Sequence, residues 1–321
     1  MKKEASEIKR EDIHIISRNS NWTEKGVHKA LKDEVYNDAA SWVKFLRLFF
    51  ISLGVSFTTA GIIFFFAYNW TDLHKFIKVG LVEGLVVVLT LLVLFTKINT
   101  TTKNILLTAA SVLVGVLFAV FGQIYQTGAN AYDLFFGWTT AIMLWVVVAN
   151  FAPLWVVFIT LINATLVLYS QQVAYEWSEV LIATLLFLIN TLFLVFSLLG
   201  TAFIDGFKPP DWFIKLVAVA SVTCATIGIV MGIYDHQKNP FWMLVTISVL
   251  LYGAGLVYGF KIKSGLFLSI IPFSIIVIVS ALLIKVSDGA SMFFIVCFFV
   301  IASVTIVIKN LMGLQKKWIN E

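Results

Sequence analysis

Long apolar stretches separated by short polar ones fill this chain from residue 45 to residue 308. Each stretch is 17–24 residues long, and about 20 helical residues cross the roughly 30 Å hydrocarbon core of a bilayer. A helix satisfies its own backbone hydrogen bonds in lipid. The pattern therefore predicts an all-α, polytopic transmembrane bundle of about ten helices. The predicted spans cover residues 45–68, 76–96, 104–122, 134–150, 153–170, 179–199, 212–233, 241–260, 264–284 and 289–308.

The first 44 residues are polar and charged, so they are predicted to form a cytoplasmic helical head, followed by the bundle over residues 45–321. Thr23 can cap a helix that runs from Glu24 to about Asn37, and a shorter helix is expected over residues 8–16. Together the two helices are predicted to form a small helical hairpin. Two roles for this head stay open. It docks on the membrane surface or on the bundle, or it binds a protein partner.

Composition supports a membrane protein, because 60% of the residues are hydrophobic and 13% are charged, against about 25% charged residues in a soluble domain. The net charge of +5 does not indicate nucleic acid binding. Ten of the 23 basic residues lie in the first 47 positions beside eight of the 18 acidic ones, so the head is mixed in sign. The predicted partner is the lipid bilayer, with no nucleic acid, and the oligomeric state stays open.

Loop charges predict the orientation, since lysine and arginine favour the cytoplasmic side. With ten spans and the N-terminus inside, nine lysines of the loops and tail lie inside and four lie outside. The inside lysines are Lys97, Lys103, Lys208, Lys215, Lys261, Lys263, Lys309, Lys316 and Lys317, and the outside ones are Lys75, Lys78, Lys238 and Lys285. Both termini are therefore predicted to be cytoplasmic.

Several kinds of chemistry have no signal in the sequence. Cys224 and Cys297 both lie inside predicted spans, without disulfide or metal-ligand spacing. There is no phosphate-binding loop, no His-Glu-x-x-His sequence and no Gly-x-Ser-x-Gly sequence. We therefore expect no enzymatic activity, no metal and no cofactor.

Glu83 is the charged residue that stands out within a span, between Gly80 and Gly84. Charged side chains in spans are costly and usually pair or serve a function. At 1.5 Å per residue from Phe76, Glu83 lies about 10 Å deep. Two interpretations stay open. Glu83 binds a proton or cation, or its carboxyl ties two helices together by a hydrogen bond.

A second polar group occurs where the first and third spans end, on the predicted outer face. Gly128 permits a tight turn there. Tyrosine and tryptophan at span ends are typical membrane-interface anchors, and this interpretation covers Trp70, Tyr132 and Trp138. The alternative is a pocket for a substrate or ion. The residues predicted to form it are Glu83, Tyr68, Asn69, Trp70, Gln123, Tyr125, Gln126 and Asp133.

Small residues recur every four positions within several spans, which lets helix backbones approach closely in lipid. We expect these residues to serve packing. Asn163 and Asn190 lie in the fifth and sixth spans, where each can hydrogen-bond across helices. The small-residue positions are Ser111, Gly115 and Ala119, then Ala220, Cys224, Gly228 and Gly232, and finally Gly255 and Gly259.

Two short motifs are familiar. One is Ala67-Tyr68-Asn69-Trp70, and the other is Gly122-Gln123-Ile124-Tyr125-Gln126 followed by Asp133-Leu134-Phe135-Phe136-Gly137-Trp138. Together they resemble a bacterial family of multi-span membrane proteins, domain of unknown function 2157, and the likeness covers about residues 10–150. The resemblance implies a bacterial cytoplasmic membrane protein with a short helical segment before its first span. It supplies no activity and no substrate.

Two functional hypotheses follow from the residues. In the first, a transporter-like protein admits a substrate or ion through the outer polar rim toward Glu83. In the second, a scaffold or sensor uses the head to bind a partner and transports nothing. An enzyme that acts on lipid-linked substrates is a weaker third.

Overall fold

The computed structural model describes residues 10–32, 39–68, 74–126, 128–203, 208–235, 238–286 and 290–320. These residues form helices and connecting turns and contain no strand, so the all-α prediction is confirmed. The helices are α1 (Arg10–Arg18), α2 (Glu24–Ala30), α3 (Ala39–Tyr68), α4 (Lys75–Phe95), α5 (Thr100–Tyr125), α6 (Ala131–Ala149), α7 (Ala152–Gln172), α8 (Glu179–Phe203), α9 (Asp211–Tyr234), α10 (Lys238–Lys261), α11 (Gly265–Val286) and α12 (Ala290–Asn320).

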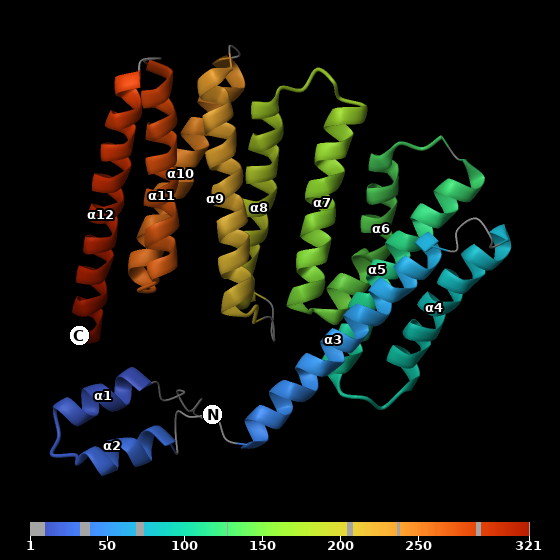
Figure 1. Ribbon diagram of the computed structural model, residues 1–321, viewed down its shortest axis with the longest axis horizontal. Helices are drawn as coiled ribbons and strands as arrows, with labels where there is room; N and C mark the ends of the chain where they lie inside the picture. The colour runs from blue at the N-terminus through green and yellow to red at the C-terminus, as the bar shows by residue number, and fades with distance from the viewer. Residues whose placement is uncertain are drawn as a thin grey trace.

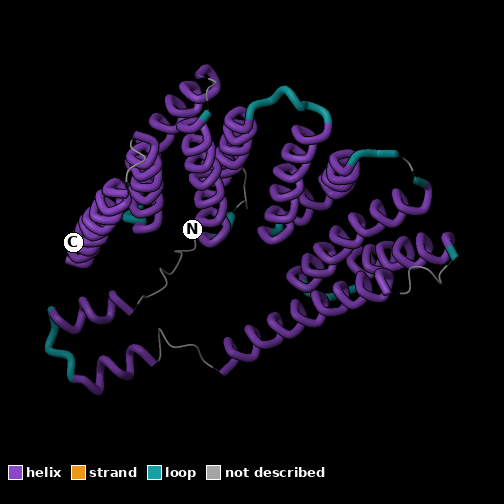
Figure 2. The backbone as a smooth tube through the Cα atoms, turned by 45° about the horizontal axis from the view of Figure 1, so that its top comes forward, coloured by secondary structure: helices purple, strands orange, loops and turns teal. Residues whose placement is uncertain are grey.

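The two short helices α1 and α2 form the predicted hairpin, apart from the long helices (Figures 1 and 2). The hydroxyl of Thr23 accepts the N–H of Gly26 at 3.3 Å, so Thr23 caps α2 as predicted. Ile13 of α1 and Leu31 at the end of α2 are both buried. These apolar side chains give the hairpin a small core of its own.

Ten helices in the described part of the chain are long and apolar enough to cross a membrane, which confirms the predicted number. Their bounds extend past the apolar stretches. Helix α3 begins at Ala39 rather than at residue 45, and α12 continues to Asn320 rather than ending at residue 308. Helix α5 begins at Thr100, because the side chain of Asn99 accepts the N–H of Thr102 at 2.7 Å and caps it.

The long helices run up and down between two faces (Figure 1). We call the face that holds Lys97, Lys208 and Lys261 the lysine face, and the opposite face, which holds Gln123 and Gln172, the amide face. Helix α3 begins and α12 ends at the lysine face (Figure 1). Helix α3 packs mainly on α5, and α12 mainly on α11, so the first and last spans are the least buried.

Small residues bring helices together in the second half of the bundle, as predicted. A methyl group added at Gly228 would lie 2.7 Å from Ala183 Cβ, and one at Gly259 would lie 3.0 Å from Phe267 Cβ. At Gly232 an added methyl group would collide with the ring of Phe241. These glycines therefore allow α8 to α11 to pack with little space between them.

Polar side chains inside this bundle pair with one another. The amides of Asn163 in α7 and Asn190 in α8 exchange two hydrogen bonds, of 3.2 Å and 3.1 Å. Asn190 is 1% exposed and also donates to the carbonyl of Leu186 at 2.8 Å. The packing role predicted for both asparagines is confirmed by this pair.

Replacing either asparagine by leucine leaves the other amide in a buried site without its partner on the neighbouring helix. We expect Asn163→Leu and Asn190→Leu each to lower the free energy of unfolding by about 1 kcal/mol, the usual size of an interhelical hydrogen bond in a membrane. The double variant should lose less than the sum, because one pair is removed only once. Unfolding in detergent mixtures measures this, and strictly additive losses would contradict a direct pair.

Candidate functional site

A cavity of about 500 Å³ lies at the amide face, where α5 ends and α6 begins. It brings together three of the residues predicted to bind a substrate, namely Gln123, Gln126 and Asp133. Gln123 lies in the last turn of α5, and Asp133 lies in the first turn of α6. The cavity therefore joins two helix ends that are neighbours in the sequence.

The turn between these helices is built from residues with left-handed backbone. Gln126 has a φ of 42° and Gly128 a φ of 65°, and glycine adopts this conformation without steric cost. The chain then enters α6, where the carboxylate of Asp133 accepts the N–H of Asn130 at 2.9 Å. Asp133 thus caps its own helix and keeps other acceptor positions for a ligand.

Gln172, at the end of α7, is a polar residue of this face that the sequence prediction missed. Its side-chain oxygen accepts the backbone N–H of Tyr132 at 2.9 Å. The ring of Tyr132 packs edge-on against Tyr169, with 5.2 Å between ring centres. The sequence offered a signal for it, because Gln171 and Gln172 are adjacent amides at the end of a span, like Gln123 and Gln126.

The remaining predicted residues lie elsewhere or outside the described part. Tyr68, at the end of α3, is 88% exposed. Tyr125 is 47% exposed and packs against Phe121 with the rings tilted and 4.5 Å between ring centres. Neither lines the amide-face cavity. Asn69 and Trp70 lie outside the described residues.

Glu83 lies on the exposed side of α4, whereas its neighbour Val82 is fully buried. A methyl group added at Gly80 or Gly84 would meet nothing within 4 Å. In the described part of the chain, no helix therefore approaches α4 at these glycines, where the sequence suggested a partner helix. Glu83 lines neither cavity described in this subsection.

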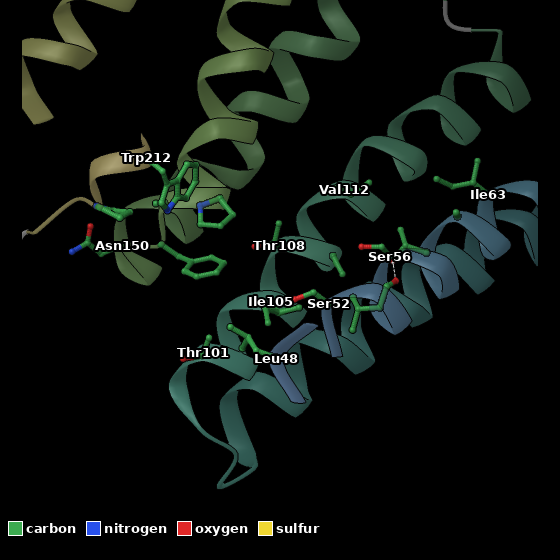
Figure 3. A pocket seen from close by; sticks show the side chains of 18 residues that line it. Leu48, Ser52, Ser56, Ile63, Thr101, Ile105, Thr108, Val112, Asn150 and Trp212 are labelled. Atoms are coloured by element: carbon green, nitrogen blue, oxygen red, sulfur yellow. Dashed lines mark hydrogen bonds between the residues drawn. The ribbon is translucent and has the colours of Figure 1, made fainter. Parts of the chain in front are cut away.

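A larger cavity of about 800 Å³ lies between α3, α5 and the starts of α7 and α9, and it reaches the lysine-face end of α5. The sequence prediction missed it. Side chains of α3 and α5 form one of its sides, and Asn150 and Trp212 lie on the other (Figure 3). Hydroxyl groups at helical spacing were a weak signal. They belong to Ser52, Ser56 and Thr59 of α3 and to Thr101 and Thr108 of α5.

The lysine-face and amide-face cavities line the same side of α5. Residues three or four positions apart share one side of a helix, and a single series of them runs from one cavity to the other. The series, which we call the α5 stripe, is Thr101, Ile105, Thr108, Val112, Gly115, Ala119, Gln123 and Gln126.

Between the two cavities, the α5 stripe is closed by Trp138 of α6. A methyl group at Gly115 would lie 2.5 Å from Cε2 of this indole, so the ring rests directly on the glycine. The indole N–H donates to the carbonyl of Ser111 at 2.7 Å. Trp138 is therefore a packing residue between α5 and α6. Its interpretation as a membrane-interface anchor stays a prediction.

Comparison with known proteins identifies the segment that carries most of these features. Residues 22–155 match the model of the family described as predicted membrane protein (DUF2157). The resemblance inferred from the motifs at Tyr68 and Gln123 is thereby confirmed. No curated protein and no solved structure matches the chain.

The matched segment runs from α2 to the first turn of α7, so it contains the α5 stripe, Trp138 and all the walls of the amide-face cavity. Pro210 and Trp212, which complete the lysine-face cavity, lie beyond it. No group of three or more histidine, cysteine, aspartate or glutamate side chains in the described residues is placed to hold a metal.

The Gly115–Trp138 contact gives a matched test of stability within α5. We expect Gly115→Ala to lower the free energy of unfolding by about 1–3 kcal/mol, the usual cost of overpacking. Gly122→Ala should be neutral or stabilising, because its added methyl group meets nothing within 4 Å and alanine favours helix. Thermal unfolding of both variants measures this, and equal effects would contradict the contact.

Proposed function

We propose that this multi-span membrane protein is transporter-like, and that its substrate follows the α5 stripe between the lysine-face and amide-face cavities. The observation that carries the proposal is the position of the two cavities. One lies toward each end of α5, along one side of that helix, and ligand sites in membrane bundles lie between helices.

The Gly115–Trp138 contact supports the proposal because it supplies a barrier. A transporter must keep its two cavities from being continuous, and here one indole ring separates them. Gln123 and Gln126 provide amide donors and acceptors at the amide face, beside the acceptor oxygens of Asp133. We assign these three side chains to substrate binding.

Glu83 is outside the proposed route, since it lines neither cavity. Its protonation-coupled role stays a prediction. The role of four further residues at the outer rim also stays a prediction, namely Tyr68, Asn69, Trp70 and Tyr125. We further propose a bacterial cytoplasmic membrane, with the lysine face and both termini in the cytoplasm, because lysine favours that side. No enzymatic step is part of the proposal.

A second function, as a scaffold or sensor, is favoured by one observation on the head. Lys25, Lys29 and Lys32 are exposed and recur at helical spacing on one side of α2, and the buried Leu31 faces the other way. A basic surface of this kind suits a partner with negative charge. Under this hypothesis the cavities are static and only the head is functional.

Distances between spin labels test transport without a known substrate. Labels at Leu48 and Trp212 span the lysine-face cavity, and labels at Tyr68 and Tyr175 report on the amide face; all four positions are exposed. We expect two populations for each pair in lipid nanodiscs, with the two faces opening in alternation. Trp138→Ala should change their ratio, because it removes the contact that closes the α5 stripe.

The labels are attached to introduced cysteines in a protein that carries Cys224→Ala and Cys297→Ala, so that neither native thiol is labelled. A pair at Leu192 and Ile227, on the tightly packed helices α8 and α9, serves as a control and should give one unchanged distance. A single narrow distance at both faces, unaffected by Trp138→Ala, would rule out alternation and favour the scaffold. Adding Glu83→Gln to the same label pairs tests whether protonation of this carboxyl is coupled to the opening and closing of the two faces.

A further inference from the structure

A second, smaller cavity adjoins the lysine-face cavity. It has a volume of about 120 Å³ and shares Asn150, Ala152 and Pro210 with the larger one of about 800 Å³. The two cavities are therefore neighbours that share part of one wall, and we call them the narrow compartment and the wide compartment. The narrow compartment lies where α7 and α9 begin, at the lysine face.

One residue that lines the narrow compartment carries a hydrogen-bond donor without an acceptor. Nε1 of Trp155, which lines it, is buried and has no hydrogen-bond partner in the described structure. A buried indole N–H normally finds an acceptor. Lys208 lines the same compartment and adds a positive charge. These two groups are suited to an acidic oxygen of a phosphate or carboxylate.

The wide compartment, in contrast, is suited to hydrocarbon. Two of its hydroxyl groups are used within their own helices, since Thr59 donates to the carbonyl of Val55 at 2.8 Å and Thr108 to that of Asn104 at 2.8 Å. The rest of its wall along α3 and α5 consists mostly of apolar side chains, among them Leu48, Ile63 and Val112. Its volume lies in the usual range of small-molecule sites, about 300–1,000 Å³.

The positions of the two compartments match the orientation of a phospholipid in a bilayer, whose headgroup lies at the surface and whose acyl chains point inward. Trp212 lines the wide compartment at the start of α9, and tryptophan prefers the level of the lipid headgroups. The compartment with Lys208 lies at that same helix start, whereas the wide compartment extends along α3 and α5 into the span. A lipid with its polar headgroup at the lysine face and its acyl chain pointing into the span would occupy both compartments.

We propose that this site binds an anionic phospholipid, with its phosphate against Trp155 and Lys208 and an acyl chain between α3 and α5. The inference names the substrate class for the lysine-face end of the proposed route, and so it rests on the proposed function for its role in transport. Binding itself is independent of movement. A protein that binds the lipid but shows no alternation would keep this inference and lose the transport proposal.

The test is lipid retention by the purified full-length protein, measured by native mass spectrometry and thermal stabilisation. The probes are phosphatidylglycerol, phosphatidylcholine and inorganic phosphate. We expect phosphatidylglycerol to bind preferentially. Lys208→Gln should weaken its binding about tenfold, and Trp155→Phe severalfold, as expected for losing hydrogen bonds to a charged group. Lys261→Gln, at the same face but outside both compartments, should change nothing.

A second pair of variants tests the acyl-chain compartment. Val112→Trp fills it and should abolish phosphatidylglycerol retention, whereas Val88→Trp, on an exposed side of α4, should not. Unfolding without added lipid confirms that each variant is folded. Equal binding of phosphatidylcholine, or equal losses in Lys208→Gln and Lys261→Gln, would overturn the proposal. Tight binding of inorganic phosphate that Val112→Trp leaves intact would indicate a free-anion site and overturn it as well.

Discussion

A polar side chain within the long helices has to find its hydrogen bond inside the protein, because hydrocarbon offers none. Most described ones do so locally or in pairs. Serine and threonine hydroxyls bond to carbonyls of the preceding turn, as Thr184 does with Val180 at 2.6 Å. Tyr252, Ser274 and Thr226 form a chain across α9, α10 and α11, with links of 2.8 Å and 2.6 Å. This constraint fixes how the helices of the second half meet.

The exceptions to that constraint show where function is to be sought. The indole N–H of Trp155 lacks a partner beside a cavity, and Glu83 lies on an exposed side of an apolar helix. The first is explained by a ligand with an acidic oxygen. The hydroxyl of Ser248 is also buried without a partner, but it lines none of the cavities described, and nothing in the structure explains it.

The sequence predicted the fold well because one physical signal, the length of apolar segments, sets the number of spans. It placed helix ends less well, since α3 and α12 continue through polar residues that hydropathy assigns to loops. Gln123 and Asp133 could be predicted to share a cavity because a single tight turn joins their helices. The lysine-face cavity could not be predicted in this way, because its walls come from several segments far apart in the sequence, from Leu48 to Trp212. Their side chains carry no distinctive pattern.

Helix α3 links the two functional hypotheses. It forms one wall of the lysine-face cavity, it packs mainly on α5, and it follows the head in the chain. A fully extended chain spans at most about 3.6 Å per residue, so the six residues 33–38 between Lys32 and Ala39 keep the head close to the membrane. Under the scaffold or sensor hypothesis, a partner that held Lys25 and Lys29 would act through this short segment on a helix that lines the lysine-face cavity. Both hypotheses therefore converge on α3, which follows the head in the chain and forms one wall of that cavity.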